Sequence, residues 1–81
     1  MSVQPILLDR SLWGTTPVRL LAWLVEPGES VTAGESLAEL AQPGMVSYLV
    51  APCDGIVQGP LFPGGDIELN TPLGWIEPFT P

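Results

Sequence analysis

Residues 27–40, PGESVTAGESLAEL, decide the fold of this chain, because a stretch of similar pattern returns as residues 63–76, PGGDIELNTPLGWI. A shift of 36 residues places apolar residues on apolar residues, in the pairs Pro27/Pro63, Gly28/Gly64, Val31/Ile67, Leu37/Leu73 and Leu40/Ile76. Gly34 meets Asn70, and both residue types tolerate a left-handed turn. Two copies of a strand–turn–strand unit would each leave an apolar face uncovered, so they should pack together. The repeat therefore predicts an all-β fold, a flattened barrel or sandwich of two antiparallel sheets with pseudo-twofold symmetry.

Short apolar runs separated by turn residues predict six strands, at residues 3–8, 18–25, 37–41, 46–50, 56–62 and 73–76. No segment carries a helical period over ten or more residues. Pro5 places the first strand at a sheet edge, because proline cannot donate to a strand ladder. The sequence Gln42-Pro43-Gly44-Met45 predicts a type II turn, with glycine at the position of positive φ. Residues 11–16 are expected to form a loop.

The length of 81 residues allows one domain, with a core over about residues 3–77. A hydrophobic content of 46% with only 14% charged residues argues against disorder. The net charge of −7 would repel phosphate backbones and anionic lipid, so neither a nucleic-acid nor a membrane partner is expected. A basic protein partner fits this charge. The alternative is an acidic surface that only keeps the protein soluble.

Cys53 is the single cysteine, so an intramolecular disulfide is excluded. The N-terminus lacks the basic start and apolar run of a signal peptide. The longest apolar stretch, residues 20–25, is too short to span a bilayer. A cytoplasmic protein is expected.

Three motifs in order resemble one known family. They are W-L-V-x-P-G-x-x-V-x-x-G-x-x-L-x-x-L at residues 23–40, A-P-x-D-G-x-V at 51–57 and G-D-I-x-x-N-x-P-L at 65–73. This pattern is similar to that of the biotinyl/lipoyl carrier domains. The resemblance implies two antiparallel sheets, with both termini at one end and the hairpin of the modified lysine at the other.

The modified lysine of that family has no counterpart in this chain. Counting back from Ala51 by the family's spacing leads to Pro43 and Gly44, and the chain contains no lysine anywhere. Its only amine is the N-terminus. We therefore expect no covalent lipoyl or biotin attachment and no cofactor.

Independent catalysis is not expected either. The chain has no histidine or lysine, so the usual general bases and amine nucleophiles are missing. Cys53 is interpreted as a half-buried structural thiol, because no histidine or lysine can activate it. Carboxylates that could in principle bind a hard cation are scattered rather than set at ligand spacing, so no metal site is expected. These are Glu35, Glu39, Asp54, Asp66, Glu68 and Glu77.

The candidate partner-binding residues are apolar and aromatic. The resemblance places the loop of residues 11–16 beside the carrier turn, where Leu12, Trp13, Met45 and Tyr48 would form a patch around Pro43 and Gly44. Trp13 could instead fold back as a lid on the barrel. Trp75 takes the place of Glu39 in the second copy of the repeat, which indicates a partly exposed face and a second contact or self-association surface. Structural turns are expected at Gly28, Gly34, Gly55, Gly64 and Asn70, and the backbone at Gly55 is expected to adopt a conformation barred to other residues.

Two hypotheses follow for the function. The first is a non-carrier lipoyl-like module that docks on another protein through the 11–16 loop and the 42–45 turn. The second is a structural subunit, or a homodimer, within a carboxylase- or dehydrogenase-like assembly. Carriage through Cys53 is a third and weaker reading.

Overall fold

The computed structural model describes residues 3–9, 14 and 17–79. Within them the chain forms eight β-strands: β1 (Gln4–Ile6), β2 (Arg19–Trp23), β3 (Ser30–Val31), β4 (Ser36–Gln42), β5 (Met45–Val50), β6 (Gly55–Gln58), β7 (Gly65–Asp66) and β8 (Gly74–Pro78). Six of them match the expected strands. The two-residue strands β3 and β7 were not predicted, because they are too short to show an alternating pattern. None of these described segments is a helix long and apolar enough to cross a membrane.

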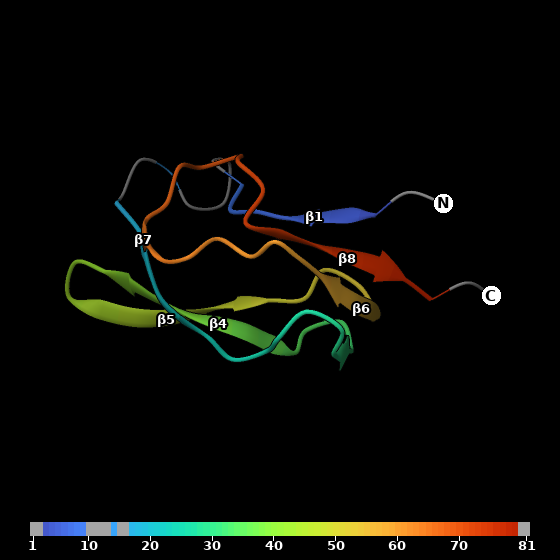
Figure 1. The fold of residues 1–81 in the computed structure, drawn as a ribbon. Helices are drawn as coiled ribbons and strands as arrows, with labels where there is room; N and C mark the ends of the chain where they lie inside the picture. Colours follow the sequence, from blue (N-terminus) through green and yellow to red (C-terminus); the bar gives the residue numbers. More distant parts are fainter. Residues whose placement is uncertain (1–2, 10–13, 15–16, 80–81) are drawn as a thin grey trace.

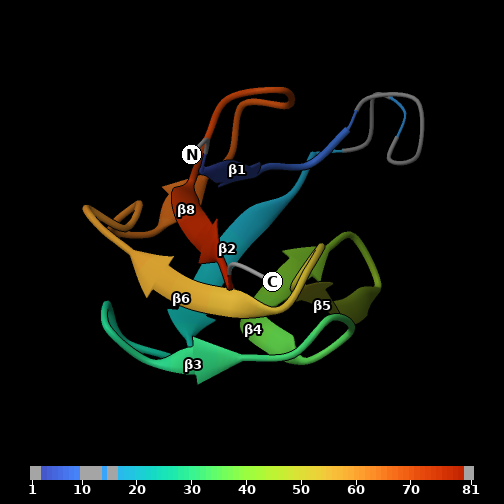
Figure 2. The same ribbon diagram turned by 90° about the vertical axis from the view of Figure 1, so that its right-hand side faces the viewer.

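The strands form two four-stranded sheets, ordered β1-β8-β6-β3 and β5-β4-β2-β7 (Figures 1 and 2). Every pairing is antiparallel, which confirms the predicted fold class. The two sheets remain separate and do not close into a barrel. A shift of 36 residues carries β2, β3 and β4 onto β6, β7 and β8, and the two strand orders then correspond. Each sheet takes its short strand from the other half of the chain, since β3 pairs with β6 and β7 pairs with β2.

The core lies between the two sheets and is built from the matched apolar positions. Leu37 and Leu40 of β4 face Val57 and Ile76 of β6 and β8, and all four side chains are completely buried. The other buried hydrophobic residues are Ile6, Leu8, Val18, Leu20, Val25, Val31, Ala38, Leu49, Ala51 and Leu73. Trp23 and Cys53 are half-buried against this core, and for Cys53 this confirms the expectation from the sequence.

Positive φ angles recur at equivalent turns of the two halves. Gly28 and Gly64 have φ of 96° and 128°, and Gly34 and Asn70 have φ of 87° and 64°. The expectation for Gly55 is wrong. Gly55 begins β6 without a positive φ, and its hydrogen atom is required for packing: a Cβ there would lie 2.6 Å from Ile76 Cγ2 and closer still to the Glu77 carbonyl oxygen.

The outer ends of β1 and β8 and the β4–β5 turn lie at opposite ends of the sandwich (Figure 1). β1 begins and β8 ends at one end, whereas the turn between β4 and β5 lies at the other (Figure 1). β1 is an edge strand, as Pro5 predicts. The position of the carrier hairpin implied by the resemblance is therefore the free end of the molecule.

Candidate functional site

The β4–β5 hairpin closes on a two-residue turn, Pro43-Gly44. Gln42 pairs with Met45 across it, and the pairing continues regularly through Leu40 and Ser47. Gly44 has a φ of 79°, close to the value of the third residue of the predicted type II turn. The Ser47 hydroxyl lies 3.3 Å from Gln42 Oε1 and donates a hydrogen bond to it. The turn is thus a well-formed, protruding structure.

The tip of this hairpin has room for a side chain but carries no reactive group. Pro43 and Gly44 are exposed, and a Cβ added to Gly44 would meet no atom within 4 Å. A side chain at this point would therefore extend into solvent. The chain contains no lysine, so no side-chain amine lies at this turn.

The structure separates Met45 from Tyr48, which the sequence grouped together. Both lie on β5 and both are exposed, at 57% and 49%. Because side chains alternate along a strand, residues three apart point to opposite faces of the sheet. Tyr48 lies on the outer face with Val46 and Val50, whereas Met45 lies at the turn on the side of the buried Leu49. Leu12 and Trp13 lie outside the described residues.

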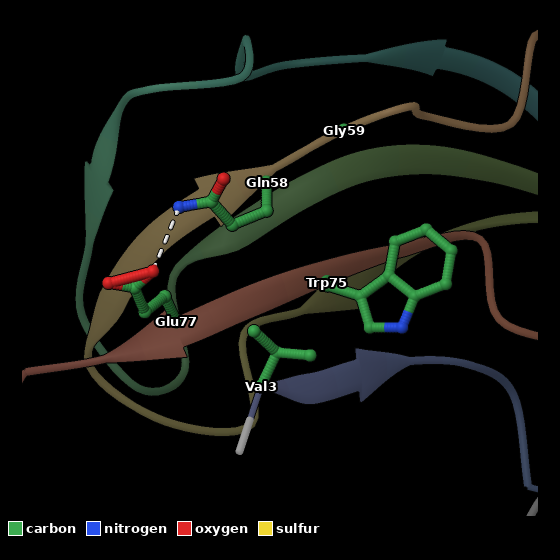
Figure 3. Close-up of a pocket in the computed structure, with 5 residues that line it drawn as sticks. All are labelled: Val3, Gln58, Gly59, Trp75 and Glu77. Carbon is green, nitrogen blue, oxygen red and sulfur yellow. Dashed lines mark hydrogen bonds between the residues drawn. The ribbon is translucent and has the colours of Figure 1, made fainter. Parts of the chain in front are cut away.

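Trp75 lies on the outer face of the other sheet, in a shallow depression of about 240 Å³ (Figure 3). The depression is lined by Val3, Gln58, Gly59, Trp75 and Glu77. The Gln58 amide donates a 3.4 Å hydrogen bond to Glu77 Oε2. The Trp75 ring is half-exposed, as predicted, but it faces away from the sheet that carries Tyr48. Tyr48 and Trp75 therefore lie on opposite sides of the sandwich.

Several carboxylates hold turns together, a role that the sequence did not reveal. Asp54 Oδ1 accepts a 2.7 Å hydrogen bond from the Ala33 amide, and Glu35 Oε1 accepts one of 3.1 Å from the Thr32 amide. The Arg19 guanidinium lies 3.3 Å from Asp66 Oδ1 at the exposed β2–β7 edge. Within the described residues, no three Cys, Asp or Glu side chains form a group that could hold a metal ion.

Trp23 has a structural hydrogen bond that also escaped the sequence analysis. Its indole N–H donates to the Phe62 carbonyl oxygen at 2.7 Å, across 39 residues of sequence. The bond ties β2 to the segment that precedes β7. An aromatic residue four positions before a Pro-Gly turn is a weak signal for such a contact, because its partner is a backbone group that no sequence pattern marks.

Two antiparallel sheets with a free hairpin opposite the termini define the architecture of a biotinyl/lipoyl domain. Residues 14–76 match the biotin/lipoyl family described as "Biotin-requiring enzyme", and the chain belongs to this family. It is also similar to an acetyl-CoA carboxylase of Schizosaccharomyces pombe, with 41% identity over 59 residues, or 73% of this chain. The chain covers only 3% of the length of that enzyme.

Proposed function

We propose that this chain is a non-carrier member of the biotinyl/lipoyl family, which binds a partner protein through the free end of its sandwich. The observation that carries the proposal is the Pro43-Gly44 turn at the place where the family resemblance puts the modified lysine. Biotin and lipoate are attached through an amide bond to a side-chain amine. Neither proline nor glycine supplies a side-chain amine, and the chain contains no lysine.

The chemistry of the free end supports binding to a protein. Pro43, Gly44 and Met45 form a blunt, uncharged tip in which the Met45 side chain is 57% exposed. Methionine adapts its shape to irregular apolar surfaces and is common at binding sites. The surrounding surface is acidic, with a net charge of −7 for the chain. This sign favours a basic protein partner over nucleic acid or membrane. The proposal includes the cytoplasmic location expected from the sequence and assigns no catalysis to the domain itself.

Intact-mass measurement tests the absence of attachment. The native chain is co-expressed with a biotin ligase and, separately, with a lipoate ligase, and a known carrier domain serves as the positive control. We expect the native chain to keep its unmodified mass. The variants Pro43→Lys and Gly44→Lys restore an amine at the tip and show whether the ligases can reach it. Added mass of one biotinyl or lipoyl group on the native chain would refute the proposal.

A pull-down with matched variants tests the binding surface. Met45→Ser removes an exposed apolar side chain from the tip. Val3→Ser removes one from the residue just before β1, and β1 begins at the opposite end of the sandwich (Figure 1). Trp13→Ala tests the contribution of the 11–16 loop. We expect a protein retained by the native chain and by Val3→Ser to be lost with Met45→Ser or Trp13→Ala. Equal retention by all four proteins would place the binding surface elsewhere.

A structural role within a larger enzyme is the second candidate, and the similarity to an acetyl-CoA carboxylase favours it. Components of a carboxylase are accordingly the first proteins to test as partners. Purified components should bind the native chain and not Met45→Ser if the tip is the docking surface. Binding that survives this change, in an assembly that loses stability without the domain, would support the structural role instead.

A further inference from the structure

β5 is the one long unprotected sheet edge among the described strands. The two sheets have four edge strands, β1, β3, β5 and β7. Proteins blunt such edges by making them short or by placing proline or charge on them. β1 has three residues and includes Pro5, while β3 and β7 have two residues each. β5 has six residues, MVSYLV, with no proline and no charge, and within the described part of the chain it pairs only with β4.

The free edge of β5 presents backbone groups and apolar side chains from the same residues. Gln42 and Met45 flank the two-residue turn and form a hydrogen-bonded pair, so the groups of Met45 point toward β4. By alternation, the N–H and C=O groups of Val46, Tyr48 and Val50 point away from β4. These three side chains lie on the outer face and are 56%, 49% and 49% exposed.

We propose that β5 pairs antiparallel with β5 of a second copy of this chain, around a twofold axis at Tyr48. This register places Tyr48 opposite Tyr48 of the second copy and Val46 opposite Val50 of the second copy. Each pair exchanges both N–H···O bonds, and all outer side chains stay on one face. Pairing joins the two β5-containing sheets into one continuous sheet. The inference rests on the β5 edge alone and does not depend on the proposed docking function.

The charge distribution permits a second copy at this edge despite the net charge of −7, because β5 itself carries no charge. Glu39 pairs with Tyr48 and is the nearest carboxylate in the same cross-strand row. In the dimer, Glu39 and its copy are three strand spacings apart, about 14 Å. This separation exceeds the Debye length of about 8 Å at physiological ionic strength. Self-pairing should therefore proceed at physiological salt and weaken at low salt.

Sedimentation analysis over a concentration series, from micromolar to millimolar, tests the pairing. We expect a reversible monomer–dimer equilibrium that Tyr48→Lys weakens about tenfold or more, since it sets like charges directly opposite each other. Leu21→Lys is the matched control, because Leu21 is 53% exposed on β2 and away from the free edge. Both variants reduce the net negative charge equally, so a general charge effect would strengthen dimers in both. A native chain that stays monomeric, or equal weakening by the two variants, would overturn the proposal.

Disulfide trapping tests the register on a Cys53→Ser background, with oxidised glutathione as the oxidant. Tyr48→Cys should form cross-linked dimers, because directly opposite Cα atoms lie about 5.5 Å apart, within disulfide range. Val46→Cys alone should not, since the two copies of residue 46 are about 13 Å apart along the strand. A mixture of Val46→Cys and Val50→Cys should cross-link. Cross-linking by Val46→Cys alone, or none by Tyr48→Cys, would refute this register.

Discussion

Two glycines at opposite ends of the sandwich, Gly44 in the β4–β5 turn and Gly55 opposite Pro78 of β8, are required for different physical reasons (Figure 1). Alanine and asparagine should therefore rank in opposite order at the two positions. Gly44 has a φ of 79° and open space around its Cβ position, so its requirement is conformational. Gly55 has no such φ, but a Cβ there would lie 2.6 Å from Ile76 Cγ2, so its requirement is steric. Asparagine adopts the left-handed region more readily than alanine but is larger. At Gly44 asparagine should therefore be the milder substitution, and at Gly55 alanine should be.

The magnitudes follow from the local geometry. A left-handed alanine costs about 1–2 kcal/mol, and the reduced entropy of the unfolded chain offsets part of this, so Gly44→Ala should cost about 1 kcal/mol. Gly55→Ala forces the β6 and β8 backbones apart and should cost about 3 kcal/mol, at the upper end for overpacking. A domain of this size has about 4–12 kcal/mol of stability in total. The expected fall in Tm is about 5 °C for Gly44→Ala and about 15 °C for Gly55→Ala.

Thermal and urea unfolding measure the loss of stability at both glycines, with tryptophan fluorescence and far-ultraviolet circular dichroism as the two signals. The four variants are Gly44→Ala, Gly44→Asn, Gly55→Ala and Gly55→Asn. A larger loss for asparagine than for alanine at position 44 would contradict the positive φ of the turn. A native-like Tm for Gly55→Ala would contradict the close approach of β6 and β8.

Three further changes can be measured by the same unfolding experiments. Trp23→Phe removes the 2.7 Å hydrogen bond to the Phe62 carbonyl oxygen and should cost about 1 kcal/mol; an unchanged Tm would mean that water replaces the bond without loss. Arg19→Gln breaks the exposed ion pair with Asp66 and should change the unfolding free energy by less than about 0.5 kcal/mol. A larger loss would point to a contribution of Arg19 beyond this ion pair. Ile76→Ala empties a fully buried position and should cost about 2–5 kcal/mol, whereas a loss below about 1 kcal/mol would show that the core collapses around it.

The repeat made most of the fold predictable, because it constrains both halves of the chain at once. It correctly paired Leu40 with Ile76, which lie in β4 and β8 and are both fully buried. The exchange of β3 and β7 between the halves was not predictable. Each of these strands has two residues, and its partner is chosen by three-dimensional packing rather than by local pattern. Gly55 illustrates a related limit, since a glycine in sequence does not reveal whether φ or space requires it.

The candidate site was predictable at its turn and less so in its surroundings. Gln42-Pro43-Gly44-Met45 carries its own conformational preference, so the turn followed from local chemistry. The grouping of Met45 with Tyr48 depended on where the strand begins. With β5 beginning at Met45, a spacing of three residues puts the two side chains on opposite faces. Trp75 belongs to the other sheet, and its separation from Tyr48 required the complete topology.

The hairpin tip contributes no side chain to the core, which bears on the absence of the lysine. No core residue comes from residues 42–45, and the nearest core residue on β5, Leu49, lies four positions from Met45. A change at Pro43 or Gly44 that preserves the turn therefore leaves the packing of the two sheets intact. The packing of the core therefore does not depend on a lysine at the tip. The unprotected β5 edge, which begins at the residue after Gly44, places the proposed self-pairing directly beside that tip.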